Sequence, residues 1–158
     1  MNAAVWVVAV GFALMGGVYF AFSGFVMGSL QALPSATGIA AMQSINRVIL
    51  SSAFMPLFWA TSLAALGLAV WGGSHWSAPG SSLLVAGGLL YVVGMFVCTA
   101  AFNVPLNNAL DAVDSTSSAG AAVWAKYLVE WTRWNHVRTA ACLAAAGLFI
   151  AAARSAAA

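Results

Sequence analysis

The chain has 158 residues, 63% of them hydrophobic and only 5% charged, with a formal net charge of +2. A soluble domain carries roughly 25% charged residues, so this composition excludes a water-soluble globular protein and indicates an integral membrane protein. The five basic side chains are too few for a nucleic-acid-binding surface, and the length predicts one domain over residues 1–158.

Four apolar stretches are long enough to cross the hydrocarbon core of a bilayer, which takes about 20 helical residues. They run approximately over Ala3–Met27, Val48–Trp71, Leu83–Phe102 and Arg138–Ala153. The first is longer than the apolar core of about 7–15 residues in a signal peptide, so we expect a retained span. Lipid offers no partner for unpaired backbone groups, and the alternation typical of a transmembrane barrel is absent. The sequence therefore predicts an all-α, integral membrane four-helix bundle.

Helical patterning continues outside two of these stretches. Residues 35–50 keep helix-compatible spacing into the second stretch, and residues 121–138 contain no Gly or Pro before the fourth. We therefore expect helices 2 and 4 to extend beyond the bilayer. Pro105 is expected to end or kink helix 3, and Gly24 and Gly28 form a GxxxG pattern that favours close packing of helix 1.

The basic residues divide unequally between the two sides of the membrane. Four spans place both termini and the second loop on one side, and the first and third loops on the other. The loop side carries Arg47, Lys126, Arg133 and Arg138, whereas the side of the termini carries only Arg154. The positive-inside rule then predicts non-cytoplasmic termini, in what we expect to be the cytoplasmic (inner) membrane of a bacterium.

The two cysteines, Cys98 and Cys142, form no CxxC and no metal-binding pattern. We expect both to be small, buried free thiols. If helices 3 and 4 are antiparallel neighbours, the two thiols are expected to share a depth in the bundle and to lie close together.

Polar side chains are concentrated in "EWTRWNHVRT" (residues 130–139), directly before the last apolar run. The residues that share one helical face there are Trp131, Trp134, Asn135 and Arg138, with Tyr127 one turn earlier. An aromatic belt at the membrane interface would explain the tryptophans, but it would not explain an asparagine and an arginine on the same face.

Arg138 is expected at or below the membrane interface. Only residues 139–153 separate it from Arg154, which is about 22 Å of helix and less than the hydrocarbon thickness. Snorkelling of its side chain to water is the alternative to a buried position.

Two other predicted helices bring polar side chains to the same level. Helix 3 ends with Asn103 and Asn107, and helix 2 begins with Gln43, Asn46 and Arg47. An intramembrane polar cluster is by default a functional-site hypothesis, and ordinary polarity near loops is the alternative.

These motifs resemble the anthrone oxygenase-like family of small membrane proteins, many of which are known only as a domain of unknown function. The similarity covers nearly the whole chain, through "MQSINR", "FNVPLNNAL", a polar linker and "W…WNHVRT". Its most specific residues are Asn103, Pro105, Asn107, Trp134, Asn135 and Arg138. The resemblance implies four transmembrane helices and, for the named members, oxygenation of a polycyclic anthrone to an anthraquinone with O2 and no evident cofactor.

Site roles follow from what that chemistry would need. An anthrone is a flat aromatic ketone with an acidic C–H, so its oxygenation requires an apolar pocket, a base and donors for an oxyanion. The expected catalytic residues are Arg138 with Asn135 or Asn103 for the oxyanion, and His136 as the base. The expected substrate-binding residues are Trp131, Trp134, Asn107, Asn46, Gln43 and Tyr127. No metal or cofactor is expected.

A non-enzymatic membrane component is the alternative class. It would bind a small lipophile or haem, or serve as a subunit of a larger complex. His75 and His136 are predicted near opposite membrane faces, so a haem would need His136 with a methionine. The expected partners are the lipid bilayer and a small lipophilic aromatic ligand, and a homo-oligomer stays open.

Overall fold

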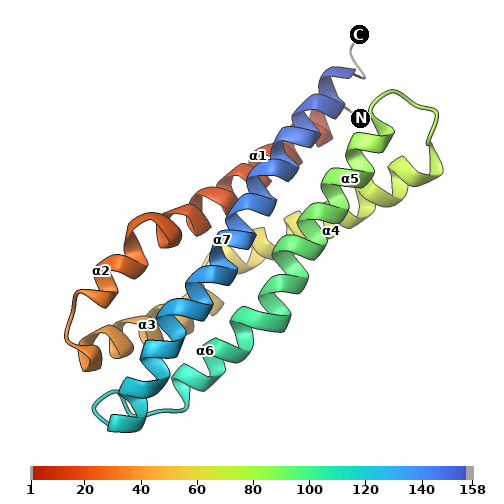
Figure 1. Ribbon diagram of the computed structural model, residues 1–158. Helices are drawn as coiled ribbons and strands as arrows, with labels where there is room; N and C mark the ends of the chain where they lie inside the picture. Colours follow the sequence, from red (N-terminus) through yellow and green to blue (C-terminus); the bar gives the residue numbers. More distant parts are fainter. Residues whose placement is uncertain (1, 156–158) are drawn as a thin grey trace.

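The computed structural model describes residues 2–155, and helices make up nearly all of them (Figure 1). In chain order the helices are α1 (Asn2–Ala21), α2 (Met27–Gln31), α3 (Ser35–Leu50), α4 (Phe54–Ser74), α5 (Ser81–Tyr91), α6 (Val104–Asp111) and α7 (Ser118–Ser155). Three π-helical segments join α1 to α2 and α5 to α6: η1 (Phe22–Val26), η2 (Val92–Val97) and η3 (Thr99–Asn103).

Four continuous helical runs among the described residues are long and apolar enough to cross a membrane. They are Ala3–Gln31, Phe54–Ser74, Ser81–Asp111 and Ser118–Ser155. The prediction of an all-α protein with four membrane-crossing helices is therefore confirmed. The last run has 38 residues, well beyond the about 20 that span a bilayer, so the predicted extension of helix 4 is also confirmed.

The second predicted helix is not continuous, because it is broken into α3 and α4. Helix α3 ends at Leu50, residues 51–53 form a turn, and α4 begins at Phe54. In a continuous helix the ring of Pro56 would clash with the carbonyl of Ser52. The break instead places Pro56 in the first turn of α4. Backbone N–H groups in the first turn have no partner within the helix, so the missing N–H of proline costs no hydrogen bond there. The hydroxyl oxygen of Ser52 accepts a hydrogen bond from the backbone N–H of Phe54 at 3.2 Å and so satisfies the first N–H of the new helix.

Pro105 was predicted to end or kink the third helix. It does not end the helix, because the helical run continues to Asp111. The segment η3 comes directly before α6, whose first turn contains Pro105. The backbone thus changes from π to α hydrogen bonding next to Pro105, whose ring nitrogen has no N–H to donate.

The ends of the bundle are arranged as the sequence predicted (Figure 1). The start of α1, the end of α7 and the α4–α5 connection lie at one end, and the α2–α3 and α6–α7 connections lie at the other. The α4–α5 connection turns at Gly80, which has φ of 84°. A Cβ at Gly80 would come within 2.7 Å of the Ala152 carbonyl oxygen, so glycine also permits the close approach to α7.

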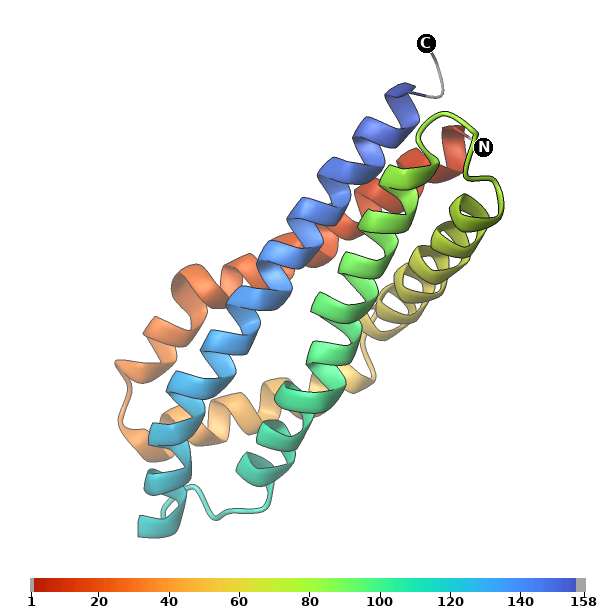
Figure 2. The same ribbon diagram turned by 45° about the vertical axis from the view of Figure 1, so that its right-hand side comes forward.

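Helix α7 lies between α1 on one side and the α5–α6 run on the other (Figure 2). The close approaches occur at Gly16, whose Cβ would meet Leu143, and at Gly94, whose Cβ would meet Ala141. The predicted role of Gly24 and Gly28 in helix packing is wrong. A Cβ at Gly28 would meet nothing within 4 Å, and one at Gly24 would meet only Phe20 of the same helix.

Two clusters of buried side chains divide the bundle along its length. The cluster nearer the termini contains Phe12 stacked on Tyr91 with ring centroids 3.8 Å apart, together with Phe149. The cluster at the other end is built around Trp124 and Met42. The candidate site lies between these two clusters.

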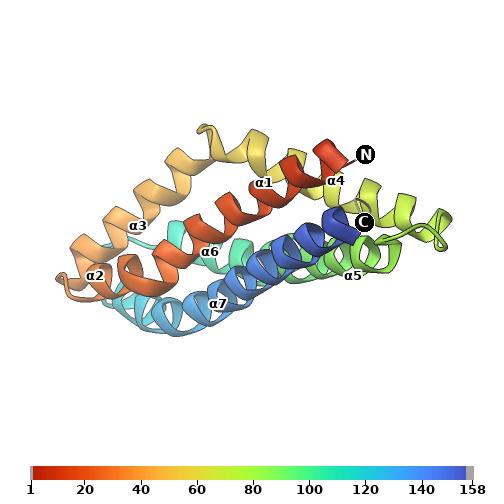
Figure 3. The ribbon, with the colours of Figure 1, turned by 90° about the horizontal axis from the view of Figure 1, so that it is seen from above.

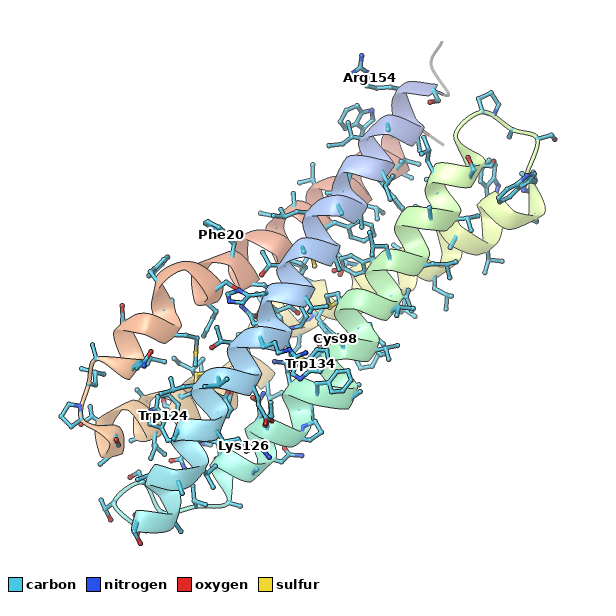
Figure 4. The ribbon with its side chains drawn as sticks, in the orientation of Figure 1. Phe20, Cys98, Trp124, Lys126, Trp134 and Arg154 are labelled. Atoms are coloured by element: carbon cyan, nitrogen blue, oxygen red, sulfur yellow. The ribbon has the colours of Figure 1, made fainter. Side chains whose placement is uncertain are left out.

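The two cysteines are buried and free, as predicted. Their shared depth is not found. The Cys98 thiol lies 3.7 Å from the carbonyl oxygen of Trp134, and Gly94 lies against Ala141, so Cys142 is displaced from Cys98 by about 7 Å along the helix axes. Figure 4 shows Cys98 beside Trp134 at the middle of the bundle.

Candidate ligand-binding site around Arg138

A cavity of about 270 Å³ lies beneath the corner at which α3 meets α4. This corner stands away from α7 and gives the bundle room on that side (Figure 3). The walls are mostly aliphatic and aromatic, and the polar side chains among them are Asn46, Thr99, Asn107 and Arg138. Ligand pockets usually have volumes of about 300–1,000 Å³, so this cavity lies just below that range and is large enough only for a small molecule.

The cavity opens between the helices. Leu50 of α3, Trp59 of α4 and Val104 of α6 line it and are also exposed on the outer surface of the bundle. These three residues belong to, or lie next to, membrane-crossing runs. The opening is therefore on a side of the bundle that lipid would cover.

Arg138 is 4% exposed and forms one wall of this cavity. Its Nη2 donates to the Oδ1 of Asn135 at 2.8 Å, and its Nη1 makes a long contact of 3.5 Å with the hydroxyl of Thr99. The Nε–H has no partner among the described residues. The guanidinium carbon lies 4.3 Å from the ring centroid of Tyr19 and 4.9 Å from that of Trp131. Both distances are within the range of a cation–π contact.

No acidic side chain neutralises Arg138, although all three in the chain lie within the described residues. Asp111 pairs with Arg47 at 2.7 Å, and Glu130 lies 3.8 Å from Lys126. Asp114 accepts bonds from the backbone N–H and the hydroxyl of Thr116, which lower the pKa of its carboxyl. A buried cation without a counter-ion costs several kcal/mol, so an anion in the cavity would be strongly favoured.

Snorkelling does not account for this arrangement. The guanidinium points into the bundle and bonds to buried groups, whereas a snorkelling arginine reaches water.

Asn135 holds Arg138 in place and ties α7 to α1. Its Nδ2 donates to the backbone carbonyl of Tyr19 and to the hydroxyl of Ser23, both at 2.7 Å, and its side chain is fully buried. Ser23 lies in η1, the π-helical segment that directly follows α1, and Tyr19 lies in the last turn of α1. Asn135 therefore ties α7 both to the end of α1 and to η1.

A stack of aromatic rings leads from the cavity toward the α6–α7 end. The ring centroids of Trp124, Tyr127 and Trp131 follow each other at 5.7 Å with nearly parallel planes. The indole N–H of Trp131 and the hydroxyl of Tyr127 both donate to the Oδ1 of Asn107, each at 2.8 Å. Asn107 thus fixes the edge of the stack that faces the cavity.

Two predicted substrate-binding or catalytic amides are buried next to the cavity rather than in its wall. Gln43 donates to the carbonyls of Leu110 and Val113 at 2.9 and 3.0 Å and so caps the end of α6. Asn103 is fully buried and donates to the carbonyl of Trp131 at 3.2 Å, while its Oδ1 has no partner among the described residues. Both amides position the elements that carry the cavity.

His136 and Trp134 lie outside the cavity, which corrects two of the expected roles. His136 is exposed on the outer face of α7. Trp134 packs flat against Phe102, with ring centroids 3.7 Å apart, on the outer side of the contact with η3. A helix turns by about 100° per residue, so the face that presents Arg138 and Trp131 cannot also present His136. His136 is therefore poorly placed as a base or as a ligand to a haem in this cavity.

The sequence did not predict that α1, η1 and the α3–α4 corner would contribute residues to the wall of the cavity. Tyr19 and Phe22 line the cavity from α1 and η1, and Phe54 and Phe58 line it from α4. The only sequence signal for the corner was the pair Ser51–Ser52 followed by Pro56. For helix 1 there was no comparable signal, because Tyr19 stands within a run of apolar residues.

The fold and the site together define a small membrane-spanning helix bundle with a buried cation in an apolar, ligand-sized cavity. The family model described as "Anthrone oxygenase" matches residues 42–148, and the chain belongs to this family. No curated protein and no solved structure matches the chain. The matched region contains Asn46, Asn107 and Arg138, whereas Tyr19 and Ser23 precede it.

Proposed function

We propose that the protein binds a flat, acidic aromatic lipophile beneath the α3–α4 corner and oxygenates its anion with O2, without a cofactor. The observation that carries this proposal is the state of Arg138: it is buried, it has no acidic partner, and it forms the polar wall of an otherwise apolar cavity. The family supplies the reaction class, because an anthrone is a flat ketone whose enolate is such an anion.

Arg138 would act on the substrate by favouring its ionised form. A guanidinium in a medium of low dielectric constant stabilises an oxyanion far more than it does in water, and it stabilises the neutral ketone much less. The residues that line the cavity include no carboxylate and no imidazole. We therefore propose that the ligand loses its proton to water at the membrane interface and enters the cavity as the anion.

The reaction then needs only O2. The enolate carbon forms a bond to O2, and the resulting peroxide anion takes up one proton to give a hydroperoxide. Loss of water from the hydroperoxide leaves a ketone, so a CH2 group and one O2 become a C=O group and one H2O. Arg138, which Asn135 holds in place, would bind the original oxyanion while the carbon at the opposite side of the ring reacts.

The lipid-facing opening suits a substrate that dissolves in the bilayer. Leu50, Trp59 and Val104 present apolar groups at the opening, so the ring system of a lipophile held at the membrane interface would stay in apolar surroundings as it moves into the cavity. The aromatic residues Phe54, Phe58 and Trp131 would then contact its ring faces.

Incubation of the purified protein with anthrone and 18O2 tests this function. We expect one labelled oxygen in the anthraquinone and the other in water, with a rate above that of the spontaneous reaction in the same detergent. Mass spectrometry of the product measures the label. A rate equal to the background, together with anthrone binding, would leave a lipophile-binding protein without oxygenase activity.

We also propose that both termini face away from the cytoplasm. Arg47 and Lys126 lie near the α2–α3 and α6–α7 end of the bundle, whereas Arg154 lies at the other end (Figure 4). Positive residues favour the cytoplasmic side. Reporter fusions after residue 78 and after the C-terminus are expected to report the same, non-cytoplasmic compartment. Cytoplasmic signals from both would reverse the orientation.

A further inference from the structure

The cavity has a second polar region in addition to the one at Arg138. Asn46 of α3 and Asn107 of α6 line it as well. Thr99, which contacts Arg138, and Asn107 belong to the same helical run and are eight residues apart, or about 12 Å along a helix. The two polar regions are therefore at different depths, with the indole of Trp131 between them.

The orientation of the Asn107 amide is fixed by its partners. The indole N–H of Trp131 is only a donor, so the Asn107 atom 2.8 Å from it must be the acceptor Oδ1. The Tyr127 hydroxyl also donates to this Oδ1. The Nδ2 of Asn107 has no partner among the described residues and is free to donate to a group in the cavity.

The same reasoning fixes the orientation of the Asn46 amide. The Tyr127 hydroxyl gives its proton to Asn107, so its oxygen accepts from the Nδ2 of Asn46 across 3.5 Å. The Oδ1 of Asn46 is then left without a donor among the described side chains. A donor on Asn107 and an acceptor on Asn46 together match one hydroxyl group, which both accepts and donates.

We propose that the ligand carries a second oxygen, a hydroxyl on an outer ring at the end of the ring system remote from its acidic oxygen, and that Asn46 and Asn107 select for it. This inference rests on the proposed function in one respect, namely that the acidic oxygen lies on Arg138. The substrate class becomes a flat lipophile whose two oxygens are roughly 6 Å apart, about the span of one to two fused rings, since hydrogen bonds of about 2.8 Å at each end take up the rest of the offset of about 12 Å. Asn46 and Asn107 are specificity residues for the distal hydroxyl.

Two fluorescent probes with the same ring system test this selectivity: 2-naphthol, with one hydroxyl, and 2,6-dihydroxynaphthalene, with a second one at the opposite end. Each probe is titrated into purified protein in detergent. The signal with Arg138→Met measures the probe that dissolves in the detergent micelle, and it is subtracted. We expect the wild-type protein to bind the dihydroxy probe about three- to tenfold more tightly, because the second hydroxyl adds neutral hydrogen bonds.

The readout in the variants is the ratio of the two dissociation constants. Asn46→Leu removes the acceptor, and Asn107→Asp keeps the acceptor for Trp131 and Tyr127 while removing the donor. Both variants are expected to bring the ratio close to one. The charge added by Asn107→Asp changes the dissociation constants of both probes, so its effect largely cancels in their ratio. Asn108→Asp, at the exposed neighbouring amide, is the matched control and should keep the wild-type ratio.

The outcomes separate this inference from the function on which it rests. Arg138-dependent binding of 2-naphthol with an equal affinity for the dihydroxy probe would overturn the distal hydroxyl and leave the proposed function standing. A wild-type preference that survives in both Asn46→Leu and Asn107→Asp would overturn the assignment of these two residues. Absence of Arg138-dependent binding of either probe would overturn both proposals.

Discussion

Replacement of Arg138 by methionine is expected to abolish binding and turnover of an acidic lipophile while leaving the fold intact. Two charge-assisted hydrogen bonds from the guanidinium would contribute about 1.5–3 kcal/mol each, so the dissociation constant should rise by at least about 100-fold. The fold should tolerate the change, because removing an unpaired buried charge also removes its desolvation cost. Methionine fills a similar volume and preserves contacts with Tyr19 and Trp131.

Isothermal titration with anthrone under anaerobic conditions measures the affinity, and thermal unfolding in detergent measures stability. Arg133→Met is the matched control, since Arg133 is an exposed arginine five residues earlier on the same helix. An affinity within threefold of wild type for Arg138→Met would remove Arg138 from the ligand site. Collapse of the fold would instead make Arg138 a structural residue.

Replacement of Asn135 by leucine is expected to cause the largest loss of stability of any single change at the site. The substitution removes the bonds to the Tyr19 carbonyl and to Ser23, and it takes from Arg138 the one short hydrogen bond that the described residues give it. Buried groups left unpaired in this way cost about 1–3 kcal/mol each, and more when charged, so the free energy of unfolding should fall by about 3 kcal/mol or more.

The buried free thiols Cys98 and Cys142 provide the measurement, since a thiol-reactive dye labels them only when the bundle opens. Asn108→Leu, at an exposed amide, serves as the control. Addition of Arg138→Met to Asn135→Leu should recover part of the stability, because the unpaired charge is gone. Purely additive losses in the double variant would show that the two side chains are not coupled.

The transmembrane organisation could be predicted from the sequence because its signal is strong. Long apolar runs in a chain with 5% charged residues leave few alternatives to helices in lipid. The break after Leu50 was missed because residues 48–71 are apolar on both sides of it. The decisive residue was Pro56, whose ring would clash with the carbonyl of Ser52 four positions earlier in a continuous helix. A hydropathy pattern contains no information about this clash.

The side chains that meet at the site were predictable only in part. Helical periodicity placed Trp131, Asn135 and Arg138 on one face, and the structure brings these three together. Periodicity also placed Trp134 there, but the wide face of α7 contacts different helices at its two edges, and Trp134 falls on the edge that packs against Phe102.

The partners of these residues could not be predicted, because they depend on tertiary register. Asn135 bonds to the backbone carbonyl of Tyr19, and no side-chain pattern encodes which carbonyl of a neighbouring helix a buried amide will meet. Gln43 was expected to line a pocket and instead caps α6 through Leu110 and Val113. An amide at a helix end can bond to backbone or ligand equally well, so sequence alone does not separate these roles.

The protonation state of a bound ligand reports most directly on the role of Arg138. Anthrone is added to the protein under anaerobic conditions, at a pH well below that at which the free compound ionises, and the absorption spectrum is recorded. We predict the spectrum of the anion with the wild-type protein and with Arg133→Met, and the spectrum of the neutral compound with Arg138→Met. A neutral spectrum with wild-type protein that has demonstrably bound anthrone would contradict the proposal that this cavity binds its ligand as an anion.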